Sequence, residues 1–301
     1  KRTLAAISKN YHLDLSQAQV NMEQFGLSPD TILTEENYHQ VFNFFATCFQ
    51  NISARSQEIR DQFAPYFTDM IDGKDKVAII DIGWSGNIQA ALSRVIAGHN
   101  HQTELRGFYL GLFPSAIQNI RSNCTMTGWL SHLDDNPEFT RILQAGGSEL
   151  LEFVLTSPDG STLSYQHNEE GKIVPVLEQK NNQEQDYEHK ALEVQKGVLA
   201  FVRNNAYLLN QFPLQALDSL SWSQPFFDLV DNPTREQIAL LADLTHSDVA
   251  GDNSSRLVLA EQLPLWDRLL RTKKYKNAYK NSFWKKGFYY RNNRSPKKYR
   301  G

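Results

Sequence analysis

The stretch from Lys76 to Ile96 joins an apolar run, a glycine-bearing turn and an amphipathic segment within about two dozen residues. Residues 77–80 are consecutively apolar, the pattern of a strand buried on both faces of a parallel sheet, and they lead into Asp81, where we expect the strand to end. Residues 82–86 leave room only for a tight turn. Apolar residues spaced three and four apart from Ile88 onward then predict a helix. This unit restricts the chain to α/β folds, in which such strands pair in parallel.

A second strand is predicted directly after this helix. Residues 105–113 are apolar and β-prone, and a polar link separates them from the helix, as a βαβ unit requires. Residues 125–131 predict a third strand, and 161–166 with 172–177 a hairpin joined through 168–171. The fold class expected is therefore α/β with a parallel sheet and helical additions.

The remaining segments predict helices. The expected helices are 13–25, 34–49, 53–70 with an interruption near Pro65, 137–155 weakened by Gly146 and Gly147, 184–210, and a short one opening at Thr234. We expect four parts: 1–72, a helical segment packing on the sheet; 73–210, an α/β phosphate-binding core with the hairpin inserted; 211–270, a helical part; and 271–301, a basic aromatic tail.

The turn after the first strand is the strongest candidate for a binding site. In open α/β sheets, free N–H groups and the positive end of the helix dipole meet a ligand at the carboxyl edge of a strand. The main-chain amides of Gly83 to Asn87, with the Ser85 hydroxyl, are expected to hold a phosphate, and Gly86 to allow its close approach. Trp84 is expected to flank a sugar or base. The alternative is a structural turn whose glycines serve only packing.

Weaker candidates lie elsewhere in the chain. Glu149 and Glu152 are three residues apart on one helix face and could act as a general base toward an acceptor hydroxyl, although such pairs are more often solvated. Arg106 and Arg121, beside the second strand, could neutralise a pyrophosphate, or could be ordinary surface arginines. No Cys or His spacing typical of a protein-bound metal is present.

The charge is distributed unevenly. Residues 271–301 hold twelve bases and no acid, a net charge of +12, whereas the first 270 residues hold nineteen bases against thirty-four acids, a net charge of −15. Eight aromatic residues are mixed among the twelve bases. We expect peripheral contact with anionic lipids, or else aromatic residues at spacing four (Tyr275, Tyr279 and Phe283) that pack back onto the acidic body. Nucleic acid is not an expected partner.

No apolar run approaches the roughly 20 residues needed to span a bilayer, and the two cysteines have no paired spacing. We therefore expect a cytoplasmic protein, peripheral at most at the inner face of the membrane. Because the chain opens at Lys1 without a methionine, we expect a fragment whose upstream part carries some of the function.

Three stretches carry a resemblance to a known family. VAIIDIGWSGNIQAAL, GFYLGLF and LLEFVLTSPDGSTLSY, within residues 1–205, resemble the C-terminal region of bacterial capsule and O-antigen biosynthesis proteins that are often labelled haloacid-dehalogenase-like hydrolases. The loop also resembles the phosphoribosyl pyrophosphate motif of type I phosphoribosyltransferases. In that motif two acids bind the ribose hydroxyls, and a Thr-Gly turn wraps the 5-phosphate.

Matched to this motif, Asp81 takes the place of the second acid, and Ser85 and Gly86 take the place of Thr-Gly. Ile80 replaces the first acid and Ile88 the last Thr, and no pyrophosphate loop is visible upstream. The resemblance implies a Rossmann-like sheet of phosphoribosyltransferase type, with Asp81 catalytic and Mg²⁺ bound together with the pyrophosphate.

The function implied is transfer of ribofuranosyl 5-phosphate from phosphoribosyl pyrophosphate to a polysaccharide or lipid-linked glycan acceptor. One alternative is a haloacid-dehalogenase-type phosphohydrolase, but no DxD follows any apolar run. The other is a non-catalytic acceptor-binding or scaffold domain of a larger polysaccharide polymerase, which the missing first acid favours.

Overall fold

The computed structural model describes residues 3–99, 103–122, 124–179, 182–209, 211, 219–246 and 257–293. The chain divides into two compact units. Unit 1 comprises residues 1–73, 159–181 and 247–256, and unit 2 comprises residues 74–158, 182–246 and 257–301. The hairpin expected as an insertion in the α/β core therefore belongs with the N-terminal helices.

Unit 1 is helical apart from this hairpin. Its elements are α1 (Leu4–Asn10), α2 (Gln19–Gln24), α3 (Tyr38–Thr47), α4 (Phe49–Ile71), β4 (Thr162–His167) and β5 (Ile173–Leu177). Leu4 and Phe44 are fully buried in its small apolar core. The break between α3 and α4 falls at Cys48, and α4 continues through Pro65 without ending. The antiparallel pairing of β4 with β5 confirms the predicted hairpin, whose Tyr165 ring contacts the rings of Phe63 and Tyr66 on α4, each with centroids 5.0 Å away.

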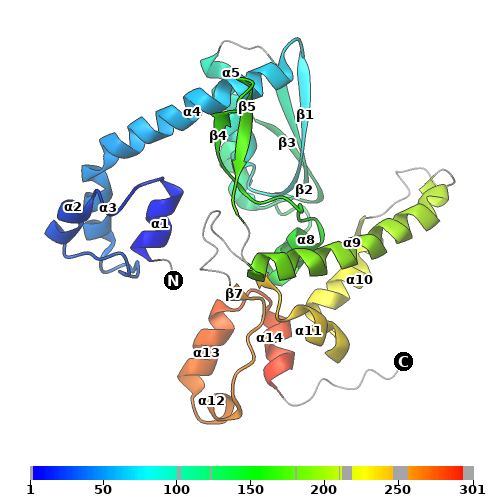
Figure 1. Ribbon diagram of the computed structural model, residues 1–301. Coiled ribbons are helices and arrows are strands. Elements are labelled where there is room, and N and C mark those ends of the chain that lie inside the picture. The colour runs from blue at the N-terminus through cyan, green and yellow to red at the C-terminus, as the bar shows by residue number, and fades with distance from the viewer. Residues whose placement is uncertain are drawn as a thin grey trace. The chain divides into compact units, whose positions relative to one another are not determined.

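Unit 2 is built on a three-stranded parallel sheet, which confirms the predicted α/β class. The strands β1 (Lys76–Trp84), β2 (Glu104–Leu112) and β3 (Thr125–His132) lie side by side in that order, and α5 (Asn87–Gly98) joins the first two (Figure 1). β1 runs three residues beyond Asp81, where we expected it to end. Its continued pairing with β2, Gly83 beside Gly111 and Trp84 beside Leu112, accounts for the extension.

The two faces of the sheet differ in burial. On one face, Tyr109 of β2 and Met126 of β3 pack with Ala90 of α5 in a small core. On the other face, Ile80 is 88% exposed and Phe108 48% exposed. The expectation that β1 is buried on both faces is therefore wrong, because the Ile80 side chain is largely exposed.

The remaining helices of unit 2 are α6 (Ile117–Arg121), α7 (Pro137–Ile142), α8 (Ser148–Val154), α9 (Asn182–Leu209), α10 (Ser219–Asp231), α11 (Arg235–Leu241), α12 (Leu265–Leu269), α13 (Thr272–Asn281) and α14 (Lys285–Asn292), with the one-turn 3₁₀ helix η1 (Pro114–Ala116) and the π-helical turn η2 (Leu143–Gly147). Ala116 of η1 and Ile120 of α6 pack in the small core, whereas most of the other helices surround a second and larger core. Two short strands, β6 (Thr245–His246) and β7 (Leu257–Val258), pair antiparallel.

The expected helix over residues 137–155 is interrupted. Gly146 has φ 120°, which a non-glycine residue rarely adopts, and the chain therefore leaves the α conformation in η2. A Cβ at Gly146 would also lie 2.8 Å from the Cα of Trp284. This interruption turns α8 away from α7 and lets α14 approach closely.

The basic C-terminal segment is not a separate tail where the structure describes it. Trp284 and Phe288 are fully buried in the large core, and the Trp284 indole Nε1 donates a 2.8 Å hydrogen bond to the Val230 carbonyl. Tyr275 and Phe283 pack against the same core. The aromatic residues on which the expected membrane contact partly depended are thus largely used in packing, as the alternative expected. Residues 294–301 lie outside the described residues.

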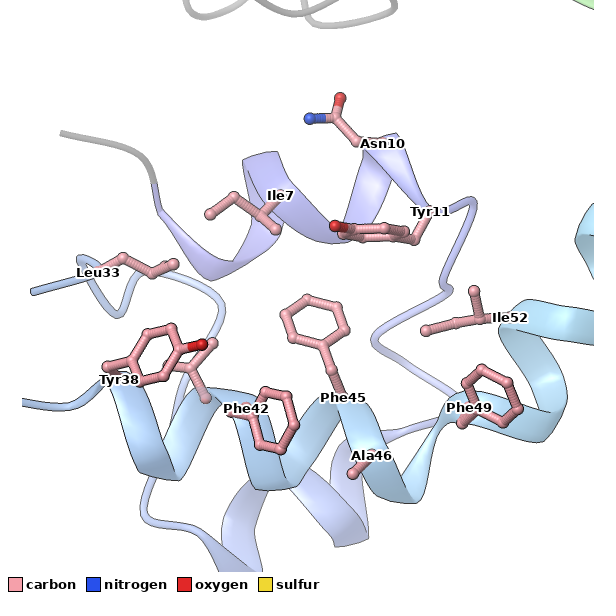
Figure 2. A pocket seen from close by; sticks show the side chains of 11 residues that line it. Ile7, Asn10, Tyr11, Leu33, Tyr38, Phe42, Phe45, Ala46, Phe49 and Ile52 are labelled. Atoms are coloured by element: carbon pink, nitrogen blue, oxygen red, sulfur yellow. The ribbon is translucent and has the colours of Figure 1, made fainter. Parts of the chain in front are cut away.

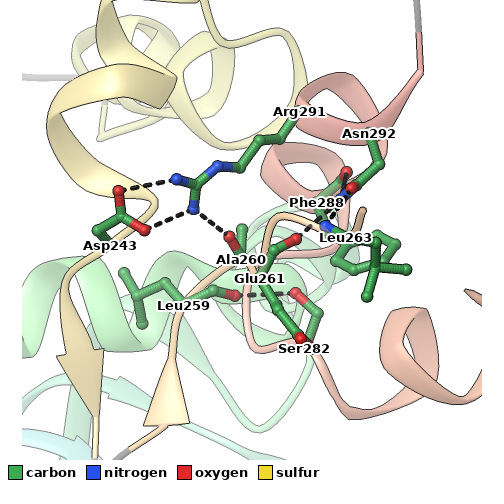
Figure 3. A network of polar contacts seen from close by, with 9 residues as sticks. All are labelled: Asp243, Leu259, Ala260, Glu261, Leu263, Ser282, Phe288, Arg291 and Asn292. Carbon is green, nitrogen blue, oxygen red and sulfur yellow. Dashed lines mark hydrogen bonds and ion pairs between the residues drawn. The ribbon is translucent and has the colours of Figure 1, made fainter. Parts of the chain in front are cut away.

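Polar contacts hold this segment in place (Figure 3). Arg291 donates to both carboxylate oxygens of Asp243, each at 2.7 Å, and to the Ala260 carbonyl at 2.6 Å. The buried amide of Asn292 accepts from the Leu263 N–H and donates to the carbonyls of Glu261 and Phe288. These contacts satisfy backbone groups of Ala260, Glu261 and Leu263, which lie in a stretch without regular secondary structure. Without such partners, these groups could not be buried at low cost.

Candidate functional site

The turn between β1 and α5 presents unpaired main-chain amides. Gly86 is the N-cap of α5, no side chain caps the helix, and its first intrahelical bond runs from the Ala90 N–H to the Gly86 carbonyl. The amides of residues 87–89 consequently have no partner of this kind in the described structure. Such amides, together with the helix dipole, form a site suited to an anion.

Gly86 has a structural role of its own. It adopts φ 68°, and an added Cβ would overlap the side-chain sulfur of buried Met126. We expected this glycine mainly to let a phosphate approach. The structure indicates instead that a larger residue here disturbs packing between the turn and β3, so a substitution at Gly86 cannot separate binding from folding.

Two residues of the short helices after β2, Ser115 in η1 and Asn119 in α6, complete the turn, and the sequence patterns did not indicate them. The Ser115 hydroxyl lies 2.8 Å from the Ser85 hydroxyl. Asn119 Nδ2 donates to the Ser85 carbonyl at 2.7 Å and to Asn87 Oδ1 at 2.9 Å. Both follow the carboxyl end of β2, so their place after a parallel strand next to β1 is the signal that would have pointed to them. Arg121, exposed in α6 two residues after Asn119, remains a candidate cation.

Asp81 lies on the sheet face that α5 covers. It pairs with Tyr109 on β2, and its Oδ1 accepts a 3.3 Å hydrogen bond from the Gly83 N–H. Burial raises the pKa of the Asp81 carboxyl above its ordinary value. Burial, with the nearby Asp81 charge, raises the pKa of Tyr109 to about 12, and the Tyr109 hydroxyl donates to Gln89 Oε1 at 3.0 Å. Asp81 is therefore a partly buried carboxylate next to a buried polar chain.

Arg106 does not belong to this group. It pairs with Glu104 at 2.7 Å on the exposed face of β2. It precedes Gly111, the partner of Gly83, by five residues, a separation of roughly 16 Å along a strand. The predicted pyrophosphate contact is not supported, because Arg106 lies toward the opposite end of the sheet from the turn.

Trp84 is anchored rather than free to stack on a ligand. Its ring stacks on Phe113 with centroids 5.2 Å apart and packs against the large core. The indole Nε1 donates a 2.8 Å hydrogen bond to Glu152 Oε1. The role expected for Trp84, flanking a sugar or base, is therefore restricted, because Phe113 stacks on its ring and Glu152 accepts its N–H.

Glu152 and Glu149 lie in different environments on α8. Glu152 joins Trp84 to His246, whose Nδ1 is 3.6 Å from Glu152 Oε2. Burial raises the pKa of Glu149, and a 2.8 Å hydrogen bond from the Ser148 hydroxyl opposes this rise only in part. Two carboxyl groups and one imidazole thus come together next to the end of β1. No sequence pattern indicated His246, because β6 consists of only two residues.

Within the described ranges, no group of three or more His, Cys, Asp or Glu side chains is arranged to hold a metal ion. Protein-bound Mg²⁺ usually takes one or two carboxylates together with substrate phosphates, and Asp81 would supply one such ligand. Among the same residues, no helix has the length and apolarity needed to cross a membrane. The chain matches neither a protein-family model nor a curated protein.

Proposed function

We propose that this chain transfers ribofuranosyl 5-phosphate from phosphoribosyl pyrophosphate to a hydroxyl of a bacterial surface polysaccharide or its lipid-linked precursor. The observation that carries the proposal is the open first turn of α5, where the amides of residues 87–89 have no helical partner and the hydroxyls of Ser85 and Ser115 lie together, while Asn119 fixes the turn by donating to the Ser85 carbonyl and to Asn87 Oδ1. A phosphate monoester matches this set of donors.

The reaction assigns a task to each group. The bond between ribose carbon 1 and the pyrophosphate oxygen breaks, the acceptor oxygen bonds to carbon 1, and the acceptor proton passes to a base. Asp81 would stabilise the positive charge that develops on the ribose. Glu152, paired with His246, or Glu149 would accept the proton. Mg²⁺ bound with the donor would supply positive charge to the departing pyrophosphate. Arg121, two residues after Asn119, would supply a further positive charge.

A second candidate is a binding module without catalysis. Asp81 is a single acid where the phosphoribosyltransferase motif has two, and the Trp84 ring is held against Phe113 and Glu152. A chain that only holds a sugar phosphate for another domain would need the amides of the turn but not the carboxylates.

Titration calorimetry tests the proposal. Phosphoribosyl pyrophosphate with Mg²⁺ is expected to bind the wild-type chain, and ribose 5-phosphate to bind more weakly at the same site. Ser85→Ala removes one donor and should weaken binding about fivefold. Ser122→Ala is the matched control, since the Ser122 hydroxyl donates to the Gln118 carbonyl of α6 and makes no contact with Ser85 among the hydrogen bonds of the described residues. Release of pyrophosphate in the presence of a glycan acceptor then separates transferase from binding module.

The proposal fails if neither ribose phosphate binds while a nucleotide sugar does. It also fails if Ser85→Ala and Ser122→Ala bind the donor equally well, because the phosphate would then lie away from this turn.

A further inference from the structure

Unit 1 contains an apolar slot that the proposed transfer reaction does not use. The slot has a volume of about 760 Å³ and lies between α1 on one side and α3 with the start of α4 on the other (Figure 2). Ile7 of α1 and Tyr11, the residue that follows this helix, line it from one side, and Phe42, Phe45 and Phe49 line it from the opposite side. Its volume is that of an ordinary small-molecule site, and its lining is similarly aromatic.

Large aromatic side chains are exposed along this slot. Tyr38 is 58% exposed, Phe42 58% and Phe49 66%. With Phe45 and Ile52 they follow one another at alternating intervals of four and three residues, and all five line the slot although α3 and α4 are separated at Cys48. A contiguous row of exposed aromatic residues is costly in water and usually marks a binding surface.

The slot is electrically neutral over most of its length. No Asp, Glu, Lys or Arg occurs between residues 37 and 54, so no carboxylate, ammonium or guanidinium group of this range flanks the aromatic row. A helix that docks on such a row is normally selected by charged flanking positions, which are missing here. The absence of charged side chains along the aromatic row matches an occupant that has no charge along its length. Because α1 forms a second wall, the site is a slot rather than an open groove.

We propose that this slot binds the single hydrocarbon chain of an amphiphile, such as an acyl or isoprenyl lipid. From Tyr38 to Ile52 the lining extends for at most roughly 20 Å of helix. A chain that spans one leaflet of a bilayer is about 15 Å long and fits within that length. The lipid-linked acceptor of the proposed transfer reaction belongs to this ligand class, but the inference depends only on residues of unit 1.

Calorimetry on the full chain provides the test, with farnesyl phosphate, farnesol and inorganic phosphate as probes. Farnesyl phosphate and farnesol should each bind one molecule per chain, and inorganic phosphate should not compete with farnesol. Phe42→Ser removes an exposed apolar wall residue, and Ala46→Trp fills the slot from an exposed position. Each should weaken farnesol binding about tenfold, the effect of losing most of one apolar side-chain contact.

Val20→Ser is the matched control, because Val20 is an exposed apolar residue of unit 1, 69% exposed, that does not line the slot. Its farnesol affinity should equal that of the wild type. Absence of farnesol binding, or equal binding by all four proteins, overturns the proposal. A dimer in analytical ultracentrifugation that Phe42→Ser dissociates would overturn it as well, because a second copy of the chain would then cover the aromatic row.

Discussion

Replacing Trp284 by alanine tests whether the basic C-terminal segment belongs to the core of unit 2. The Trp284 ring is fully buried, and its Nε1 donates to the Val230 carbonyl at 2.8 Å. Removing a buried tryptophan costs about 3–5 kcal/mol, and leaving the buried Val230 carbonyl without a partner adds to this cost. We expect a loss of about 4–5 kcal/mol in the free energy of unfolding. For a unit of about 200 residues this lowers Tm by roughly 10 °C or more.

Urea denaturation followed by tryptophan fluorescence is the appropriate assay. All five tryptophans of the chain belong to unit 2, so the signal reports on that unit alone. Trp266→Ala is the matched control, because Trp266 is 70% exposed on α12 and its loss should change stability by no more than about 0.5 kcal/mol. If both variants cost the same, or if Trp284→Ala costs less than about 1 kcal/mol, the segment is not part of the core.

Further predictions concern three residues of the candidate site. Asp81→Asn should lower turnover by about two orders of magnitude in a pyrophosphate-release assay if the carboxylate supports the reaction. Because burial raises the pKa of Asp81, the folded state keeps the carboxyl proton to a higher pH than the unfolded state does. The free energy of unfolding should therefore fall as the pH rises just above the ordinary pKa of 3.8. Asp81→Asn should remove this fall and should be the more stable protein at pH 7 in urea titrations. Gly86→Val should lower the free energy of unfolding by at least about 2 kcal/mol, and adding Met126→Ala should restore part of this loss. An unchanged urea midpoint for Gly86→Val would contradict the packing of Gly86 against Met126. Glu152→Ala should cost about 1–2 kcal/mol by leaving the Trp84 N–H unpaired, whereas Glu152→Gln keeps an acceptor and should cost less than half as much in the same titration; equal costs would mean that the hydrogen bond contributes nothing.

The local elements were predictable where a pattern within a short window determines them. The apolar run before Asp81, the turn and the amphipathic segment after it predicted β1 and α5, and the order of elements predicted parallel pairing with β2. The capping box at Thr234, where Gln237 pairs with the cap residue, likewise marked the start of α11. These features depend on backbone geometry and on contacts between residues a few positions apart.

The composition of the candidate site was only partly predictable. Asp81, Ser85 and Asn87 could be named because they follow a strand, but Ser115 and Asn119 approach the same turn only through the pairing of β2 with β1. His246 reaches Glu152 from almost a hundred residues further along the chain. A contact of this kind leaves no periodicity in the sequence, because it depends on how distant elements pack.

The sequence by itself determined the α/β class, the parallel strands and the loop that follows β1, because hydrophobic spacing and glycine placement act locally. Only the tertiary structure decided which aromatic residues are available to a ligand. Trp284 is fully buried and Trp84 is stacked on Phe113, and both indole N–H groups are bonded within unit 2, whereas Phe42 and Phe49 remain exposed along the slot of unit 1. Burial of an aromatic side chain is decided by which distant surface packs against it, and residue type and spacing do not specify that surface.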